Sequence, residues 1–176
     1  MTTITATTIS DDSLHLDQLS SMQVDELDSL YRQGTLPASF SVLNGTPKGR
    51  MLAIRSLDQT PLFGPISLLS KAKVFPWEGK SFNATSDCTG TGINRINLTL
   101  LKQQWFPFNT RVEPSVIDGQ DCIYLDYDLP DNPWFVRKIR DELREVSPGL
   151  FLGPAMWKTG DNEAALVLWF AIDTTQ

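Results

Sequence analysis

The chain has 176 residues and a net charge of -6, with 41% hydrophobic and 20% charged residues. This composition suits one folded domain with a sizeable core, and it excludes a disordered chain. It also argues against binding to duplex nucleic acid, because that function needs a positively charged surface. Five Trp, nine Phe and three Tyr residues suit either a core or a ligand cavity.

The sequence carries no sign of secretion, a membrane span or a metal site. Its two cysteines, Cys88 and Cys122, do not make a disulfide framework, and the N-terminus lacks the basic and apolar regions of a signal peptide. The longest apolar run, near residues 164–172, is shorter than the roughly 20 residues that cross a bilayer. The only histidine is His15, and a metal site needs several ligands. We therefore expect a cytoplasmic protein without a membrane span, metal or cofactor.

The N-terminal region predicts a tail followed by one helix. Residues 1–17 are mostly Thr, Ser and Asp and indicate a flexible tail, so that residues 18–176 would form a single domain. Apolar residues at steps of three and four predict a helix from Ser20 to Gln33, and the Gly and Pro that follow would end it.

Strand signals dominate from about Phe40 onward. Turn-rich joins separate predicted strands over residues 49–57, 74–85, 91–101, 105–117 and 122–128. Pro107 and Pro114 indicate that the fourth of these is interrupted or lies at a sheet edge. Residues 60–70 predict a loop with a short helix, which is either a lid over a cavity or a plain connection.

The last part of the chain predicts one more helix and two strands. Asn132 can cap a helix, Pro133 suits its first turn, and apolar residues from Phe135 to Val146 fall on one helical face, so a helix is predicted over 133–146. Strands over 150–158 and 165–172 follow. The predicted fold is mainly β, an antiparallel barrel of about seven to nine strands with a short N-terminal helix and one helix near 133–146. A barrel of about eight strands can hold one small ligand.

Two stretches of sequence resemble a known family. The stretch Trp77–Phe82 reads W-E-G-K-S-F and resembles the W-x-G-K-x-F stretch of small bacterial barrel proteins that carry a GXWXG motif. The run Ile139–Val146, leading into Pro148–Gly153, resembles the late helix and hairpin of bacterial proteins of this type. With the strand layout, about half of the chain resembles lipocalin-like (calycin-type) small β-barrel proteins. This resemblance implies a cavity for a small apolar molecule and no shared set of catalytic residues.

One cluster of polar residues is predicted from strand alternation. Because alternate side chains share a face, Tyr124 and Asp126 point the same way, and so do Arg111 and Glu113 on the preceding strand. Pairing of these strands would gather all four side chains. Inside a barrel they would form a ligand anchor or a proton-transfer site, and outside it a solvated surface.

Arginine and tryptophan side chains are further candidates for ligand binding. Arg55 and Arg95 each lie among apolar residues of a predicted strand. An inward arginine could bind a carboxylate or phosphate group with its planar fork, whereas an outward one would only rest its stem on the sheet. The tryptophans that could line a pocket, or equally belong to the core, are Trp77, Trp157 and Trp169.

Three functions remain open. The leading hypothesis is a protein that binds a small hydrophobic or amphipathic molecule in a barrel cavity, with Arg111 or another arginine as polar anchor. The second is a cofactor-independent isomerase or cyclase that acts on an apolar molecule in the same cavity, with Asp126, Glu113 or Tyr124 as the acid. The third is a protein-interaction module that uses the helix over 133–146. A homodimer is compatible with each, and the sequence leaves open whether the protein is an enzyme.

Overall fold

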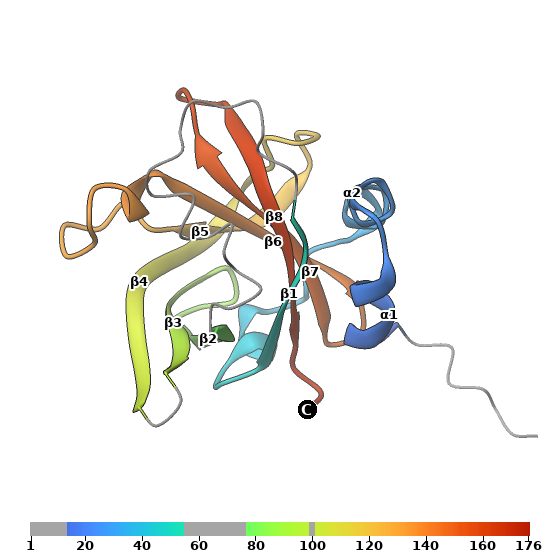
Figure 1. Cartoon of the computed structure of the whole chain (residues 1–176), viewed down its shortest axis with the longest axis horizontal. Coiled ribbons are helices and arrows are strands. Elements are labelled where there is room, and N and C mark those ends of the chain that lie inside the picture. The colour runs from blue at the N-terminus through green and yellow to red at the C-terminus, as the bar shows by residue number, and fades with distance from the viewer. Residues whose placement is uncertain (1–13, 55–76, 99–100) are drawn as a thin grey trace, which may run out of the picture.

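The structure, a computed structural model, describes residues 14–54, 77–98 and 101–176. Eight antiparallel strands form one sheet that curls into a nearly closed barrel, as the sequence predicted (Figure 1). The strand order is β1-β8-β7-β6-β5-β4-β3-β2. The strands are β1 (Lys48–Ile54), β2 (Trp77–Ala84), β3 (Thr89–Leu98), β4 (Leu101–Pro114), β5 (Asp121–Asp126), β6 (Ile139–Ser147), β7 (Leu150–Lys158) and β8 (Ala164–Asp173). The predicted loop over 60–70 lies outside the described residues.

The N-terminal helix predicted over 20–33 is present as two helices, α1 (Leu16–Ser21) and α2 (Val24–Gln33). The break lies at Gln23, whose backbone N–H donates to Glu26 Oε2 at 2.7 Å and so begins α2 with a capping box. Two short 3-10 helices, η1 (Phe40–Leu43) and η2 (Val136–Lys138), are the other helices of the described residues. None of the helices within the described ranges has the length and hydropathy of a membrane span.

Two glycines allow the ends of the sheet to meet. A Cβ atom on Gly49 of β1 would lie 2.3 Å from the Cα atom of Gly79 of β2, which is closer than any side chain permits. Gly79 also has φ +130, a conformation that favours glycine. Next to this contact, the backbones of Gly45 and Phe82 exchange two hydrogen bonds of 3.0 Å. The barrel therefore closes through backbone contact between β1 and β2.

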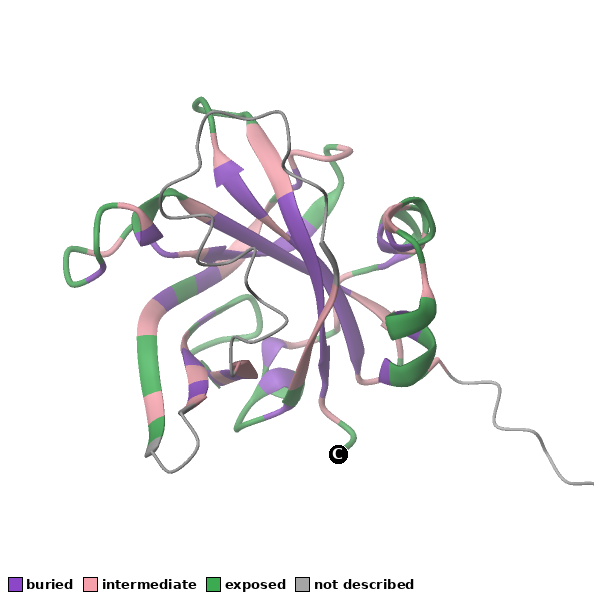
Figure 2. Ribbon diagram, viewed as in Figure 1, coloured by how far each residue is buried: buried purple, intermediate pink, exposed green. Residues whose placement is uncertain are grey.

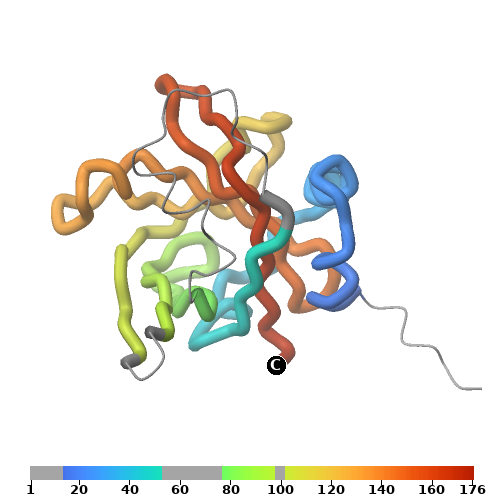
Figure 3. The backbone as a smooth tube through the Cα atoms, viewed as in Figure 1, coloured from blue at the N-terminus to red at the C-terminus, as the bar shows by residue number. Residues whose placement is uncertain are grey.

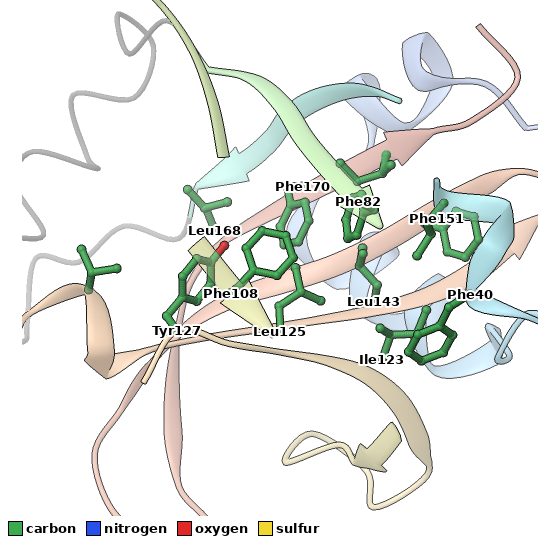
Figure 4. Close-up of a cluster of buried hydrophobic side chains, with 13 residues drawn as sticks. Phe40, Phe82, Phe108, Ile123, Leu125, Tyr127, Leu143, Phe151, Leu168 and Phe170 are labelled. Atoms are coloured by element: carbon green, nitrogen blue, oxygen red, sulfur yellow. The ribbon is translucent and has the colours of Figure 1, made fainter. Parts of the chain in front are cut away.

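The barrel interior is filled by a hydrophobic core along most of its length. In Figure 4 the labelled side chains extend from Phe40 and Phe151 on one side to Tyr127 and Leu168 on the other. Phe40 belongs to η1. Its backbone N–H donates to the carbonyl of Asp87 in the turn between β2 and β3. That end of the barrel is thus plugged by apolar side chains.

A second apolar layer lies outside the barrel, under the N-terminal helices. Leu19 of α1 and Leu27 and Tyr31 of α2 are fully buried against Leu152 of β7 and Trp169 of β8. The chain trace shows the two helices standing beside the barrel wall (Figure 3). Strands β7 and β8 are consequently buried on both faces over much of their length (Figure 2).

The prediction of a helix over 133–146 is wrong. After η2 the chain forms β6, which pairs with β5 on one side and β7 on the other. The run R-D-E-L-R-E-V favours a helix by local propensity, but pairing with two strands overrides that preference. The sequence of β6 does not alternate between apolar and polar residues as a half-exposed strand would, because both of its faces are buried. Leu143 packs in the core, and Arg144, which is 0% exposed, lies over the ring of Tyr31 in α2.

Strand β4 is neither interrupted nor at an edge, although Pro107 and Pro114 suggested one or the other. It runs between β3 and β5 from Leu101 to Pro114. The proline is accommodated by a bulge: Ile93 pairs with Pro107 and Asn94 with Trp105, so Phe106 has no partner residue. Phe106 has φ 60, a strained backbone conformation for an aromatic residue.

Candidate functional site

A cavity of about 170 Å³ lies inside the barrel, at the end opposite the η1 plug. Its lining comes from β1, β2, β3, β4, β6, β7 and β8, from Tyr127 just after β5, and from the η2 region. The residues that line it are Met51, Trp77, Lys80, Asn94, Ile96, Trp105, Phe106, Tyr127, Phe135, Val136, Ile139, Asp141, Ala155, Met156, Trp157, Val167, Leu168 and Phe170.

Most of the cavity wall is apolar and much of it is aromatic. Trp77 and Phe170 meet edge to face with ring centroids 5.9 Å apart, and Trp157 of β7 is buried. An apolar protein cavity of about 150 Å³ is large enough to bind benzene. The cavity here therefore has room for one aromatic ring or a short aliphatic chain.

Four polar residues interrupt the apolar wall, and we call them the inner polar cluster: Lys80, Asn94, Tyr127 and Asp141. The Lys80 ammonium donates to Asp141 Oδ2 at 2.8 Å, to the Tyr127 hydroxyl at 2.6 Å and to Asn94 Oδ1 at 2.9 Å. The Tyr127 hydroxyl in turn donates to Asp141 Oδ2 at 3.0 Å. All four side chains are at least nine-tenths buried.

Asn94 holds the inner polar cluster in place against the bulge of β4. Its Nδ2 donates to the Phe106 carbonyl at 3.3 Å and to the Tyr127 hydroxyl at 3.1 Å, and its Oδ1 also accepts from Trp77 Nε1 at 3.1 Å. The strained residue Phe106 thus presents its carbonyl to the cluster and its side chain to the cavity. The bulge orients groups at the cavity wall, a frequent role of β-bulges.

Burial dominates the electrostatics of the inner polar cluster. Loss of hydration lowers the pKa of Lys80, and the charge of Asp141 opposes that change. Burial, followed by the charge of Asp141, raises the pKa of Tyr127 well above its usual value, so the phenol remains protonated. Asp141 Oδ1 has no hydrogen-bond partner among the described residues. The arrangement places an amine, a phenol and an incompletely paired carboxylate together in an apolar site.

The four polar residues predicted to gather on β4 and β5 are brought together, and we call them the outer polar face: Arg111, Glu113, Tyr124 and Asp126. Arg111 donates to Glu113 Oε1 at 2.6 Å and to Asp126 Oδ2 at 2.8 Å. Tyr124 donates to Asp126 Oδ1 at 3.1 Å. These side chains point away from the barrel interior, because Tyr124 alternates with the core residues Ile123 and Leu125.

On the outer polar face, the charged side chains form ion pairs and cover the buried ring of Tyr124. Tyr124 is 3% exposed and lies between the guanidinium groups of Arg111 and Arg140, at 4.6 and 4.3 Å from its ring centroid. Partial burial opposes ionisation of Asp126, but hydrogen bonds from Arg111, the Asp128 backbone and Tyr124 outweigh it and lower the pKa of Asp126. A groove of about 390 Å³ beside this face is lined mainly by charged and polar side chains.

The other predicted site residues fall into different places. Trp77 and Trp157 line the cavity. Trp169 lies on the opposite face of β8, where its ring centroid is 5.5 Å from that of Tyr31. Arg95 donates to the backbone carbonyls of Thr46, Pro47 and Glu78 and so ties β2 and β3 to the segment before β1. Arg55 lies outside the described residues.

Sequence reasoning missed the inner polar cluster. Lys80 was noticed only as part of the W-E-G-K-S-F resemblance. A signal for Tyr127 was present, since it follows Ile123 and Leu125 at steps of two and therefore shares their inward face. Asp141 could not be found, because the stretch that contains it was predicted to be a helix.

Comparisons with protein-family models, with curated proteins and with solved structures found no match to this chain. The functional argument therefore depends on the geometry of the cavity and its polar groups.

Proposed function

We propose that the protein binds a small, mainly apolar molecule inside the barrel. The observation that carries this proposal is the cavity of about 170 Å³, whose wall is apolar except for the inner polar cluster. Transfer of apolar ligand surface from water into such a site is favourable by about 25 cal/mol per Å². The polar cluster at the wall suits a hydrophobic or amphipathic molecule with one polar group.

The nearly closed barrel is compatible with the lipocalin-like resemblance of the sequence, which implies the same use of the interior. The arginines suggested as polar anchors do not support this role equally. Arg111 lies on the outer polar face, and the Arg95 guanidinium is engaged with backbone carbonyls. Lys80 is the cation that lines the cavity among the described residues, so it takes the place of the expected arginine.

A titration with toluene tests the proposal. Trp77 and Trp157 line the cavity, so saturable binding of one toluene molecule should change the tryptophan fluorescence. The variant Ala155→Leu fills the cavity from β7 and should weaken binding at least about tenfold, which corresponds to about 1.4 kcal/mol. Ala38→Leu makes the same chemical change at an exposed residue and should bind like the wild type. Absence of saturable binding, or equal binding by Ala155→Leu, would contradict the proposal.

A second candidate is proton-transfer catalysis, such as isomerisation of an apolar carbonyl compound, in the same cavity. It is favoured by the contact of Tyr127 and Asp141 with Lys80 at the cavity wall. These groups are better placed than Asp126, Glu113 and Tyr124, which lie on the other face of the sheet. General acid–base catalysis of this kind contributes about 10²–10⁴-fold.

Deuterium exchange tests the second candidate. Acetophenone incubated with the protein in heavy water should exchange its methyl protons faster than in buffer, as followed by proton NMR. Tyr127→Phe should slow this exchange at least about tenfold if the phenol takes part in the transfer. Exchange at the uncatalysed rate would exclude this activity for the probe and leave the binding proposal unaffected.

A further inference from the structure

The amino group of Lys80 is in direct contact with an acid and a base at the wall of an apolar cavity. Its Nζ atom lies 2.8 Å from Asp141 Oδ2 and 2.6 Å from the Tyr127 hydroxyl. An amine that reacts with a carbonyl compound must first give up a proton, and later the departing hydroxyl group must receive one. Both transfers have a partner within hydrogen-bond distance of Lys80.

The surroundings favour release of the Lys80 proton. In an apolar site both charges of an ion pair lose hydration, which makes the neutral amine and carboxylic acid more competitive with the pair. Asp141 Oδ1 has no hydrogen-bond partner among the residues that the structure describes, so its negative charge is stabilised through one oxygen only. Burial also lowers the pKa of Lys80. Lys48, by contrast, is exposed and donates to Gln176 Oε1.

We propose that Lys80 forms a covalent imine with a small apolar aldehyde or ketone in the barrel cavity. This inference rests on the proposed function, since the carbonyl compound must first occupy the cavity. Asp141 takes a proton from the Lys80 ammonium, and the free amine adds to the carbonyl carbon, so that a C–N bond forms and the C=O π electrons move to oxygen.

The second half of the reaction releases water. The carbonyl oxygen takes up the second amine proton to become a hydroxyl group. Asp141 returns its proton to this hydroxyl, directly or through the Tyr127 hydroxyl that it contacts. The C–O bond breaks, water departs, and the nitrogen lone pair forms the C=N bond. The product is a protonated imine beside an ionised carboxylate, so the total charge is unchanged and neither reactant is oxidised or reduced.

The site also suits the protonated imine that forms. Lys80 Nζ lies 5.0 Å from the ring centroid of Phe170 and 5.3 Å from those of Phe108 and Tyr127. Aromatic faces at such distances attract a cation. The imine nitrogen would retain these rings and the Asp141 carboxylate as neighbours, while the apolar substituent of the carbonyl compound would extend into the cavity.

Reductive trapping of the full-length protein tests the inference. We would incubate it at neutral pH with benzaldehyde and sodium cyanoborohydride, then measure the intact mass and map the modified peptide. We expect one benzyl group, attached to Lys80. Its initial rate of labelling should exceed that of exposed Lys48 and Lys102 by about tenfold or more, because Asp141 and Tyr127 lie where they can transfer the protons of the reaction.

Competition and substitution sharpen this experiment. Toluene should reduce labelling of Lys80 and leave that of Lys48 unchanged. Asp141→Asn should slow labelling of Lys80 by about a hundredfold, because it removes the group that accepts and returns the proton. Lys80→Met should lose the specific adduct. The wild-type peptide map decides the matter even where a variant folds poorly.

The outcomes separate this inference from the proposed function. Saturable toluene binding together with an unlabelled Lys80 would overturn the imine and leave the cavity proposal standing. Absence of both toluene binding and Lys80 labelling would overturn both. If toluene does not reduce labelling of Lys80, the aldehyde reaches the amine without occupying the cavity. That result would also overturn the inference.

Discussion

The inner polar cluster and the outer polar face lie on opposite sides of the same sheet and come closest at the end of β5, but they have opposite character. Asp126 precedes Tyr127 in the chain and Arg140 precedes Asp141, so neighbouring residues serve different faces. Outside, the Asp126 carboxylate accepts hydrogen bonds on both oxygens and remains partly exposed. Inside, Asp141 is paired through one oxygen and is shielded from water.

The difference teaches that burial and the number of partners, more than residue type, decide what a charged group can do. The Asp126 carboxylate is stabilised in its ionised form by its hydrogen bonds. The Asp141 carboxylate, in the apolar cavity, instead lies within hydrogen-bond distance of an amine and a phenol with which it can exchange a proton. The following predictions test this contrast, from the largest expected effect to the smallest.

Breaking the inner pair should have the largest effect on stability. Asp141→Ala would leave the Lys80 ammonium buried without its counter-charge, which typically costs about 3–5 kcal/mol in the free energy of unfolding. Urea unfolding monitored by circular dichroism measures this loss. The double variant Lys80→Met/Asp141→Leu replaces the pair by apolar side chains and should be no less stable than the wild type. A loss below about 1 kcal/mol for Asp141→Ala would contradict this account, because it would mean that the Lys80–Asp141 pair contributes no more than an exposed ion pair.

A smaller and pH-dependent effect is expected at Asp118, which binds buried Arg144 through both carboxylate oxygens at 2.7 and 2.8 Å. Asp118→Asn should lower the free energy of unfolding by about 1–3 kcal/mol at neutral pH. The hydrogen bonds from Arg144 lower the pKa of Asp118 below its usual 3.8 in the folded protein. The stability that the carboxylate contributes is therefore complete above pH 3.8 and is lost as the pH falls through the lower folded value.

The measurement for Asp118 is urea unfolding of the wild type and the variant at neutral pH and in acid. The difference between them should shrink as the solution is acidified below the folded pKa of Asp118. Asp28→Asn provides a matched control, since it breaks a more exposed ion pair with Arg32 and should cost at most about 0.5 kcal/mol. A difference for Asp118→Asn that persists unchanged in strong acid would contradict this account.

The smallest effect is expected on the outer polar face. Asp126→Asn weakens the ion pair with Arg111, whose side chain is 42% exposed, and should cost about 0.2–1 kcal/mol. Toluene affinity should remain that of the wild type, because Asp126 points away from the cavity. A change in cavity binding would mean that the two faces are energetically coupled through β5, and would weaken the contrast drawn above.

Strand alternation predicted the outer polar face correctly as a group but could not decide its side. Arg111, Glu113, Tyr124 and Asp126 gather whichever way the sheet curls. Inside and outside differ only through the closure of the barrel, which depends on distant contacts such as that between Gly49 and Gly79. The inner polar cluster was harder still to predict from the sequence, because its members come from β2, β3, the end of β5 and β6.

The sequence by itself determined the class of this protein: a mainly β fold of about eight antiparallel strands with an N-terminal helical region. Local patterns suffice for that conclusion, because strand alternation and turn residues depend on near neighbours in the chain. Only the tertiary structure decided that residues 139–147 form a strand and that Lys80 meets Asp141 inside the barrel. The strand depends on pairing with β5 and β7, and the contact joins residues 61 apart in the chain, so local propensity encodes neither.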